Sequence, residues 1–207
     1  MQRDFWLDRW REGRINFHEQ AVNPHLARWW GAIGAGRDVL VPLCGKTHDL
    51  HWLLARGHHV TGVELSPIAC EAAFAEHGLR PTREEAGAFV AWRAGDLTIL
   101  QGDVFDLVGA FDAVWDRAAT IALPPDTRAR YAAHLRSLVR PGGGVLLVTM
   151  DYPQEAREGP PFAVPEAEVH VSWPEAKLLD RVDLGATPRA QEWGVRRLWE
   201  EVWAIRV

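Results

Sequence analysis

The middle of the chain contains short, largely apolar runs that show little polar alternation. Such runs are typical of strands that are buried on both faces, as in a parallel sheet. We predict strands of this kind over residues 39–43, 59–65, 111–116 and 145–150. A hairpin or strand pair is predicted over residues 89–92 and 97–100, with its turn at residues 94–96.

Apolar residues recur at helical spacing before and between these runs. Helices are predicted over residues 5–10, 18–33, 47–56, 68–77 and 126–139. Ser66 stands before Pro67, as an N-cap residue stands before a first-turn proline, and Asp126 is placed to cap the last helix. Asn23-Pro24 either breaks or starts the second helix.

The order of these elements predicts the fold class. Strands alternate with helices, which implies right-handed βαβ crossovers and a doubly wound, mostly parallel α/β sheet. N-terminal helices precede this sheet. Residues 151–175, rich in Pro, Glu and Gly, are predicted to form a loop, and residues 193–207 an antiparallel terminal strand or hairpin.

The composition is that of an ordinary globular domain. The 207 residues are 47% hydrophobic and 25% charged, which suits one domain with a large core. The net charge of −5 and the lack of a Lys/Arg block disfavour a nucleic-acid partner. Because no apolar segment could span a bilayer or serve as a signal core, we expect a cytoplasmic protein, by default a monomer, with reduced thiols at Cys44 and Cys70.

A turn with a single glycine follows the first predicted strand. Ligands of doubly wound sheets bind at the carboxyl ends of the strands, and Gly45 has no Cβ to keep a ligand away. The turn is not Gly-x-Gly-x-x-Gly, which weakens the case for an NAD(P)-dependent oxidoreductase. A plain tight turn is the alternative interpretation.

An acidic residue ends the second predicted strand. Glu64 lies 19 residues after Gly45, close to the spacing at which such sheets hold a ribose through its hydroxyls. A carboxylate can accept both hydroxyl hydrogen bonds. The pair therefore indicates a nucleoside cofactor, and an exposed strand-end glutamate is the alternative.

Two further strand ends carry polar candidates. Asp103 follows residues 97–100 and could accept a hydrogen bond from an adenine amino group, although a turn aspartate explains it equally well. Arg117 ends the strand over residues 111–116, where it could bind an anionic substrate or a cofactor carboxylate. A surface pair between Asp116 and Arg117 is the alternative.

A metal site is not expected. Cys44, His48 and His51 lie near one another in sequence, but no second Cys/His pair stands at ligand spacing. Cys44 is also a weak candidate nucleophile, since no base is implied nearby.

Motifs spread from residue 5 to about residue 165 resemble those of the bacterial thiopurine S-methyltransferases. The matching motifs are Phe5-Trp6, Arg9-Trp10, Phe17-His18, Asn23-Pro24, Val41-Pro42-Leu43-Cys44-Gly45-Lys46, Gly62-Val63-Glu64-Leu65-Ser66, Gln101-Gly102-Asp103, Asp116-Arg117-Ala118-Ala119, Ile121-Ala122-Leu123-Pro124 and Gly159-Pro160-Pro161-Phe162.

This resemblance implies a class I methyltransferase fold with S-adenosyl-L-methionine as the methyl donor. It implies cofactor contacts at Trp10, Leu43, Glu64 and Arg117, to which the strand-end argument adds Gly45 and Asp103. Trp10 would belong to a helix that folds over the cofactor, because aromatic faces attract a sulfonium cation. Within one domain, 1–207, we expect a helical lid (1–35), a cofactor-binding core (36–150) and a substrate loop with terminal strands (151–207).

The resemblance also implies the activity. We expect methyl transfer to the sulfur of a thiopurine, of another small thiol, or to selenium or tellurium compounds. Thiopurine thiols are largely ionised near neutral pH, so Arg117 is expected to orient an anionic substrate, with Phe17 and Arg189 as further substrate contacts. A nucleoside-binding sensor without transfer activity is the alternative function.

Three residues depart from the family pattern: Asn16, Trp115 and Thr120. Two of them, Trp115 and Thr120, flank the presumed pocket, so the substrate preference of this chain could differ from that of its relatives.

Overall fold

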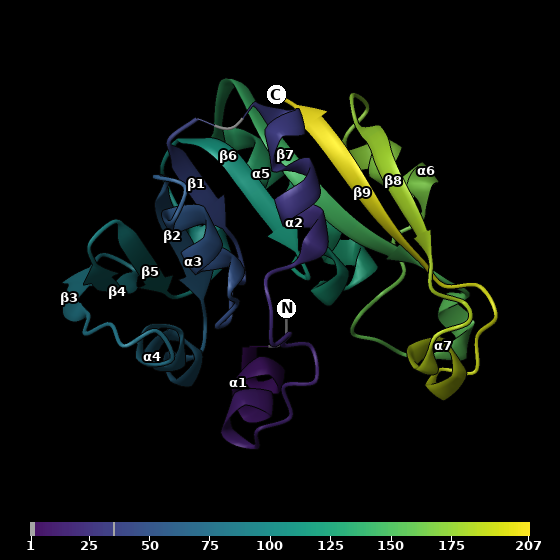
Figure 1. The fold of residues 1–207 in the computed structure, drawn as a ribbon, viewed down its shortest axis with the longest axis horizontal. Coiled ribbons are helices and arrows are strands. Elements are labelled where there is room, and N and C mark those ends of the chain that lie inside the picture. The colour runs from purple at the N-terminus through teal and green to yellow at the C-terminus, as the bar shows by residue number, and fades with distance from the viewer. Residues whose placement is uncertain (1–2, 35) are drawn as a thin grey trace.

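One mixed sheet organises the chain in the computed structural model, which describes residues 3–34 and 36–207. Its nine strands are β1 (Asp38–Val41), β2 (His59–Glu64), β3 (Thr82–Ala86), β4 (Phe89–Ala94), β5 (Leu97–Gln101), β6 (Phe111–Arg117), β7 (Val139–Asp151), β8 (Lys177–Asp183) and β9 (Trp199–Arg206). They lie in the order β3-β4-β5-β2-β1-β6-β7-β9-β8 (Figure 1).

The five central strands, β5-β2-β1-β6-β7, are parallel, whereas the strands on both flanks are antiparallel to their neighbours. The chain moves from β1 to β2 on one side and later returns to β6 on the other side. Strand order therefore reverses at β1, and in such sheets the ligand site lies at the carboxyl ends of the strands at this point. The predicted fold class is confirmed, including the antiparallel C-terminal strand β9.

Helices cover both faces of the sheet. They are α1 (Arg3–Arg11), α2 (Pro24–Trp29), α3 (Asp49–Leu54), α4 (Pro67–Ala75), α5 (Pro125–Leu138), α6 (Glu166–Ser172) and α7 (Pro188–Glu192). Figure 1 shows α1 beyond the edge toward which β1 and β6 point. No helix in the described ranges is long and apolar enough to cross a membrane.

Successive side chains of a strand point to opposite faces of the sheet, so the apolar core is divided into two layers, one on each face. Leu40 of β1 packs with Tyr131 and Leu135 of α5, whereas its neighbours Val39 and Val41 pack with residues of α2, α3 and α4. Both sets are buried, as expected of a strand covered on both faces. The sheet is therefore held rigidly between two apolar layers, and its strand ends are fixed in position.

One of the two predicted helix caps is found, and the open alternative at Asn23-Pro24 is decided. Ser66 caps α4, accepting a hydrogen bond from the Ala69 N–H at 3.4 Å. Asn23 starts α2 rather than breaking it, because its side chain accepts from the His25 N–H at 2.9 Å. The helix predicted over residues 18–33 is therefore wrong in its first turns, and its last residues form a 3₁₀ turn. Asp126 does not cap α5; it lies in the first turn, after Pro124.

The predicted loop and terminal segments also needed correction. Residues 151–175 contain α6, and the predicted terminal segment 193–207 holds a single strand, β9, which begins at Trp199. Strands β3 and β8 and helix α7 were not predicted, and β7 begins at Val139, six residues earlier than expected. The hairpin of β4 and β5 is confirmed.

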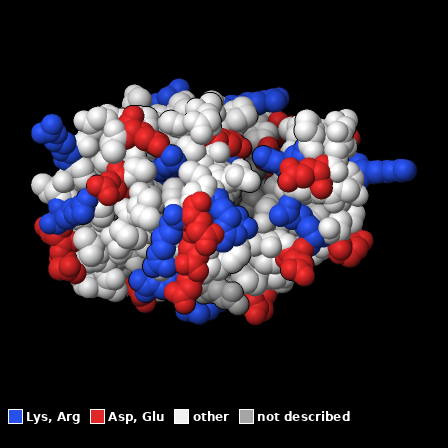
Figure 2. All heavy atoms as spheres, turned by 90° about the horizontal axis from the view of Figure 1, so that it is seen from below, with Lys and Arg blue, Asp and Glu red and all other residues white. Residues whose placement is uncertain are grey.

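Seen from below, Lys and Arg side chains are interspersed with Asp and Glu (Figure 2). The described side chains of this face form no continuous basic area. The mixed charge pattern of the sequence is thus kept on this face of the molecule.

Candidate active site

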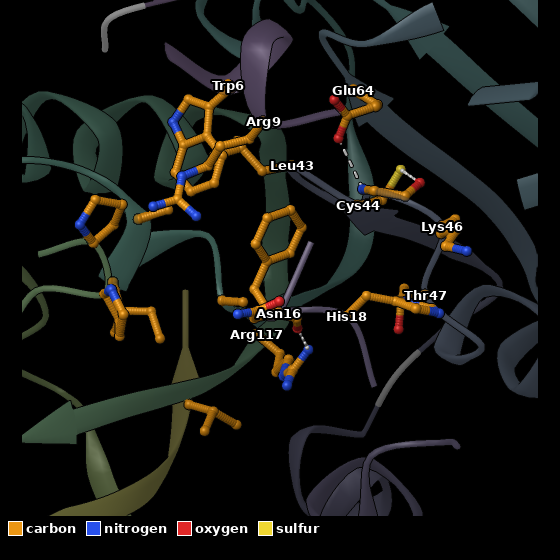
Figure 3. Close-up of a pocket in the computed structure, with 18 of the residues that line it drawn as sticks. Trp6, Arg9, Asn16, His18, Leu43, Cys44, Lys46, Thr47, Glu64 and Arg117 are labelled. Carbon is orange, nitrogen blue, oxygen red and sulfur yellow. Dashed lines mark hydrogen bonds between the residues drawn. The ribbon is translucent and has the colours of Figure 1, made fainter. Parts of the chain in front are cut away.

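A cavity of about 520 Å³ opens at the carboxyl ends of the central strands. Its wall includes the N-terminal segment from Trp6 to His18, the ends of β1, β2 and β6, the region from Arg157 to Trp193, and residues of β7 and β9 (Figure 3). Seven of the eight residues predicted for the site line it, and Asp103 does not: the seven are Trp10, Phe17, Leu43, Gly45, Glu64, Arg117 and Arg189.

Glu64 and Gly45 meet at the end of β2. The Gly45 N–H donates a hydrogen bond to Glu64 Oε2 at 2.9 Å (Figure 3). The Ser66 N–H donates to Oε1 at 2.8 Å. Burial raises the pKa of Glu64, while bonds from the Ser66, Gly45 and Leu65 backbones act in the opposite direction. Each carboxylate oxygen keeps a further acceptor position, so the group can still receive two hydroxyls.

Positive φ angles gather at the strand ends. Gly45 has a φ of 54°, which a glycine adopts easily, but Leu43 at 48° and Ala118 at 64° are not glycines. Both of these strained residues line the cavity, one after β1 and one after β6. Such strain persists where the surroundings impose it, and it concentrates at ligand-binding sites.

Aromatic rings from the N-terminal segment cover the glycine turn. A Cβ on Gly45 would lie 3.3 Å from Cζ2 of the buried Trp10 ring, so the indole rests directly on this turn. Phe17 packs edge to face against Trp10 at 5.7 Å and against Trp6 at 5.6 Å between ring centroids. The result is an aromatic wall that could face a cation.

Arg117 is held in the wall and does not form the surface pair with Asp116 that was considered. Its guanidinium is paired with Glu19 and donates to the Phe17 carbonyl at 3.4 Å, with 15% of the side chain exposed. Asp116 is buried and accepts from the Thr120 N–H at 3.0 Å and from the Thr120 hydroxyl at 2.7 Å. Burial raises the pKa of Asp116.

Asp103 has a local partner. Its carboxylate accepts from the Phe105 N–H at 3.0 Å and caps a short 3₁₀ turn, while its neighbours Gly102 and Val104 line the cavity. The side chain therefore plays the turn role that the sequence left open.

The C-terminal part contributes cavity residues that sequence reasoning did not find. The carboxylate of Glu200, in β9, accepts a hydrogen bond from Nε2 of the His25 ring at 2.8 Å. Burial alone would raise the pKa of Glu200, but the His25 hydrogen bond and the nearby charges of Arg117 and Arg189 lower it overall. These contacts join segments 175 residues apart, so no local pattern could signal them.

The departures from the family pattern fall in different places. Asn16 and Trp115 line the cavity, and the Trp115 indole N–H donates to buried Asp49 at 2.8 Å. Thr120 does not line it but supports Asp116.

A group of histidines lies beside the cavity, but it differs from the set of Cys44, His48 and His51 that was considered from the sequence. The possible ligand atoms of His18, His48 and Glu76 lie within 4.8 Å of one another. The Lys46 ammonium is 2.5 Å from Glu76 Oε1 and already supplies a positive charge there. His51 instead binds the Ala73 carbonyl.

Cys44 lies apart from this histidine group. Its side chain is buried, and burial raises the pKa of its thiol far above the usual range. A protonated, enclosed thiol is a poor metal ligand and a poor nucleophile.

Comparison with known proteins identifies similar sequences along the whole chain. The family model described as thiopurine S-methyltransferase (TPMT) matches residues 1–207. A thiopurine S-methyltransferase of Pseudomonas paraeruginosa is 47% identical over 217 residues, covering 100% of this chain and 99% of the relative. That of Nitrosospira multiformis is 42% identical over 215 residues, covering 99% and 98%.

Solved structures of methyltransferases share the fold. The 1,6-didemethyltoxoflavin-N1-methyltransferase of Burkholderia thailandensis, solved with S-adenosylhomocysteine, has a TM-score of 0.66 at 21% identity and covers 99% of this chain and 86% of its own. The N-methyltransferase NodS of Bradyrhizobium japonicum, also solved with S-adenosylhomocysteine, has a TM-score of 0.64 at 15% identity, covering 88% and 83%.

Proposed function

Because the chain belongs to the thiopurine S-methyltransferase family and is therefore an S-adenosylmethionine-dependent methyltransferase, we propose that its acceptor is the sulfur of a thiopurine or of another small thiol. The cofactor site rests on the hydrogen-bonded pair of Gly45 and Glu64 under the Trp10 ring, at the strand-order reversal. The acceptor is supported by the family similarity and by Arg117 and Arg189 in the same cavity wall. Selenium and tellurium compounds extend the same acceptor class.

The cavity residues fit the cofactor. Glu64 would accept the ribose hydroxyls, and the strained Leu43 backbone would lie beside the methionyl part. Gly102 and Val104, the neighbours of Asp103, would lie at the adenine end. Trp10 would present its ring to the positive sulfur. When bound, S-adenosylmethionine supplies an electrophilic methyl group on a sulfonium.

The remaining residues explain transfer without a general base. An acidic thiol arrives as a thiolate, so the protein must attract it, orient it and exclude water. Arg117 supplies a fixed positive charge beside Phe17, and Arg189 adds a second one from α7. Orientation of this kind can contribute roughly 7–11 kcal/mol to lowering the barrier.

A panel of methyl acceptors with labelled S-adenosylmethionine tests the proposal. We expect labelled product with 6-mercaptopurine and with small thiols, and none with matched alcohols or amines. Calorimetry with S-adenosylhomocysteine accompanies the panel. Binding of this ligand without transfer to any thiol would indicate the nucleoside-binding sensor instead.

Replacing Arg117 tests its role separately. Arg117→Ala is expected to lower kcat/KM for the thiol by about 10- to 100-fold, the effect of losing a charged hydrogen bond. Stability should change by only about 0–1 kcal/mol, because the partner Glu19 is partly exposed. Arg93→Ala removes an exposed pair with Glu84 and serves as the control with full activity. Unchanged transfer by Arg117→Ala would remove Arg117 from the mechanism.

A further inference from the structure

Four arginines line the cavity: Arg9, Arg117, Arg157 and Arg189. Within the described part of the chain, Arg117 alone among them has a carboxylate within 4.0 Å, that of Glu19. The acidic side chains of the same wall are largely engaged elsewhere: Asp49 with Trp115, Glu64 with backbone amides and Glu200 with His25; Glu192 lies on α7 with Arg189. Arg9, Arg157 and Arg189 thus have no ion-pair partner within 4.0 Å among the described residues, although Arg189 lies near enough to Glu200 to lower its pKa.

Arg9 and Arg157 share a further feature. The Nε atoms of both are buried and have no hydrogen-bond partner among the described residues. Arg9 stacks on Phe5 at 4.8 Å and Arg157 on Trp193 at 4.2 Å, so both guanidinium planes are held by aromatic rings. Their remaining hydrogen bonds are long: 3.4 Å from Arg9 to the Arg14 carbonyl and 3.3 Å from Arg157 to the Pro160 carbonyl.

The two guanidinium groups are close enough to repel each other. Burial lowers the pKa of Arg9, and the charges of Arg14 and Arg157 lower it further. Arg9 comes from α1, whereas Arg157 comes from the segment after β7, so folding brings two like charges together at one wall. An oxyanion between them would relieve the repulsion and satisfy the buried donors.

We propose that Arg9 and Arg157 form a subsite for an oxyanion carried by the methyl acceptor, away from its reacting sulfur. The inference rests on the proposed function and narrows it to thiols that also bear a carboxylate, sulfonate or similar group. Arg9 lies with Trp6 on one side of the cavity, and Glu64 and Cys44 lie on the other (Figure 3). The oxyanion subsite is therefore separated from the proposed ribose position. Planar arginine forks suit oxyanions because they can donate two parallel hydrogen bonds.

A pair of product analogues tests the subsite without requiring turnover. The complex with S-adenosylhomocysteine is titrated calorimetrically with 3-(methylthio)benzenesulfonate and with the uncharged 3-(methylthio)benzenesulfonamide of similar size. We expect the sulfonate to bind about 10-fold more tightly or better. Arg9→Gln and Arg157→Gln should each reduce this preference, and Arg157→Lys should retain part of it.

Arg56→Gln is the matched control, since Arg56 stacks on Trp52 at 3.3 Å but does not line the cavity. It should keep the full preference. Equal affinity of the protein for the two analogues, or an unchanged preference in both glutamine variants, would overturn the subsite. Weaker S-adenosylhomocysteine binding in those variants, with the preference intact, would assign the pair to the cofactor's carboxylate and also overturn it.

A parallel transfer assay separates the subsite from the proposed function. With 3-mercaptobenzenesulfonate as acceptor, we expect methyl transfer that Arg157→Gln slows more than it slows transfer to 3-mercaptobenzenesulfonamide. A sulfonate preference in binding, without transfer to either thiol, would reject the thiol acceptor while retaining the oxyanion subsite.

Discussion

Glu64 is a buried carboxylate with both oxygens bound to backbone amides, and its burial has a consequence for pH. A protonated carboxyl group loses acceptor capacity for hydroxyls, so cofactor affinity should fall as the pH falls through the Glu64 pKa. Because burial raises this pKa, the fall should begin at a higher pH than for an exposed glutamate. Calorimetry with S-adenosylhomocysteine between about pH 8 and pH 4.5 would measure it.

Glu64→Gln provides the comparison for that titration. The amide cannot accept two hydroxyls and also keep both backbone amides satisfied, so affinity at neutral pH should fall by about 10-fold or more. The affinity of Glu64→Gln for S-adenosylhomocysteine should also lack the pH dependence that we expect of the parent protein. Equal affinity in the two proteins would contradict the assignment of Glu64 to the cofactor.

Gly45 combines a left-handed backbone with a close ring. In Gly45→Ala the new Cβ costs roughly 1–2 kcal/mol at a φ of 54° and meets the Trp10 ring at 3.3 Å, so the ring must move. We expect lower stability in urea together with weaker S-adenosylhomocysteine binding. Gly57→Ala is the matched control: its φ is 81° and the space around it is open, so stability alone should fall. Full binding by Gly45→Ala would argue against a lid resting on this turn.

At the scale of elements, α1 depends on the cavity that it covers. The helix has nine residues, too few to be stable alone, and Trp10 is its one buried residue. We therefore expect its amides to exchange with deuterium much faster than those of α5 in the free protein, and to become protected when S-adenosylhomocysteine binds. Helix α5, whose buried residues hold it on the core, should already be protected in the free protein, so it should show no change over the same short labelling times. Equal protection of α1 with and without ligand would contradict the lid.

The elements that the sequence predicted are those with a buried apolar pattern. Strands β1, β2 and β6 were found because both of their faces are covered. Strand β3, Thr-Arg-Glu-Glu-Ala, is almost wholly exposed at the sheet edge and is defined only by pairing with β4. The other edge strand, β8, is similarly polar. Edge strands like these show no buried apolar pattern in the sequence, because pairing with the neighbouring strand holds them in the extended conformation.

The residues of the site also divide into those that a local sequence pattern predicts and those that it does not. Gly45 and Glu64 could be predicted because both follow strands whose relative position the fold class dictates. Arg9, Arg157 and Glu200 could not, since their contacts depend on how the N-terminal segment and the region after β7 close over the strand ends. Family resemblance supplied Trp10 and Phe17, and for Trp10 an ordinary core position would be the simpler interpretation of the sequence alone.

At the scale of the whole molecule, the strand-order reversal explains why so many segments of the chain line one cavity. Parallel strands bring their carboxyl ends to one edge, and β9 returns antiparallel to place Glu200 at that edge as well. Binding of one ligand there would join the N-terminal helix, the sheet and the C-terminal region. Ligand binding should therefore stabilise the protein as a unit.

Two buried thiols can report this global stabilisation. Cys44 and Cys70 are enclosed, and burial raises the pKa of each, so both stay protonated and should react with a disulfide reagent only after unfolding. S-adenosylhomocysteine at 100 times its Kd should add about 2.7 kcal/mol and slow the labelling of both thiols by about 100-fold. Cys44→Ser isolates the Cys70 signal, which lies outside the cavity wall. Rapid labelling of Cys44 alone, blocked by ligand while Cys70 stays slow, would instead show entry of the reagent through the cavity without global opening.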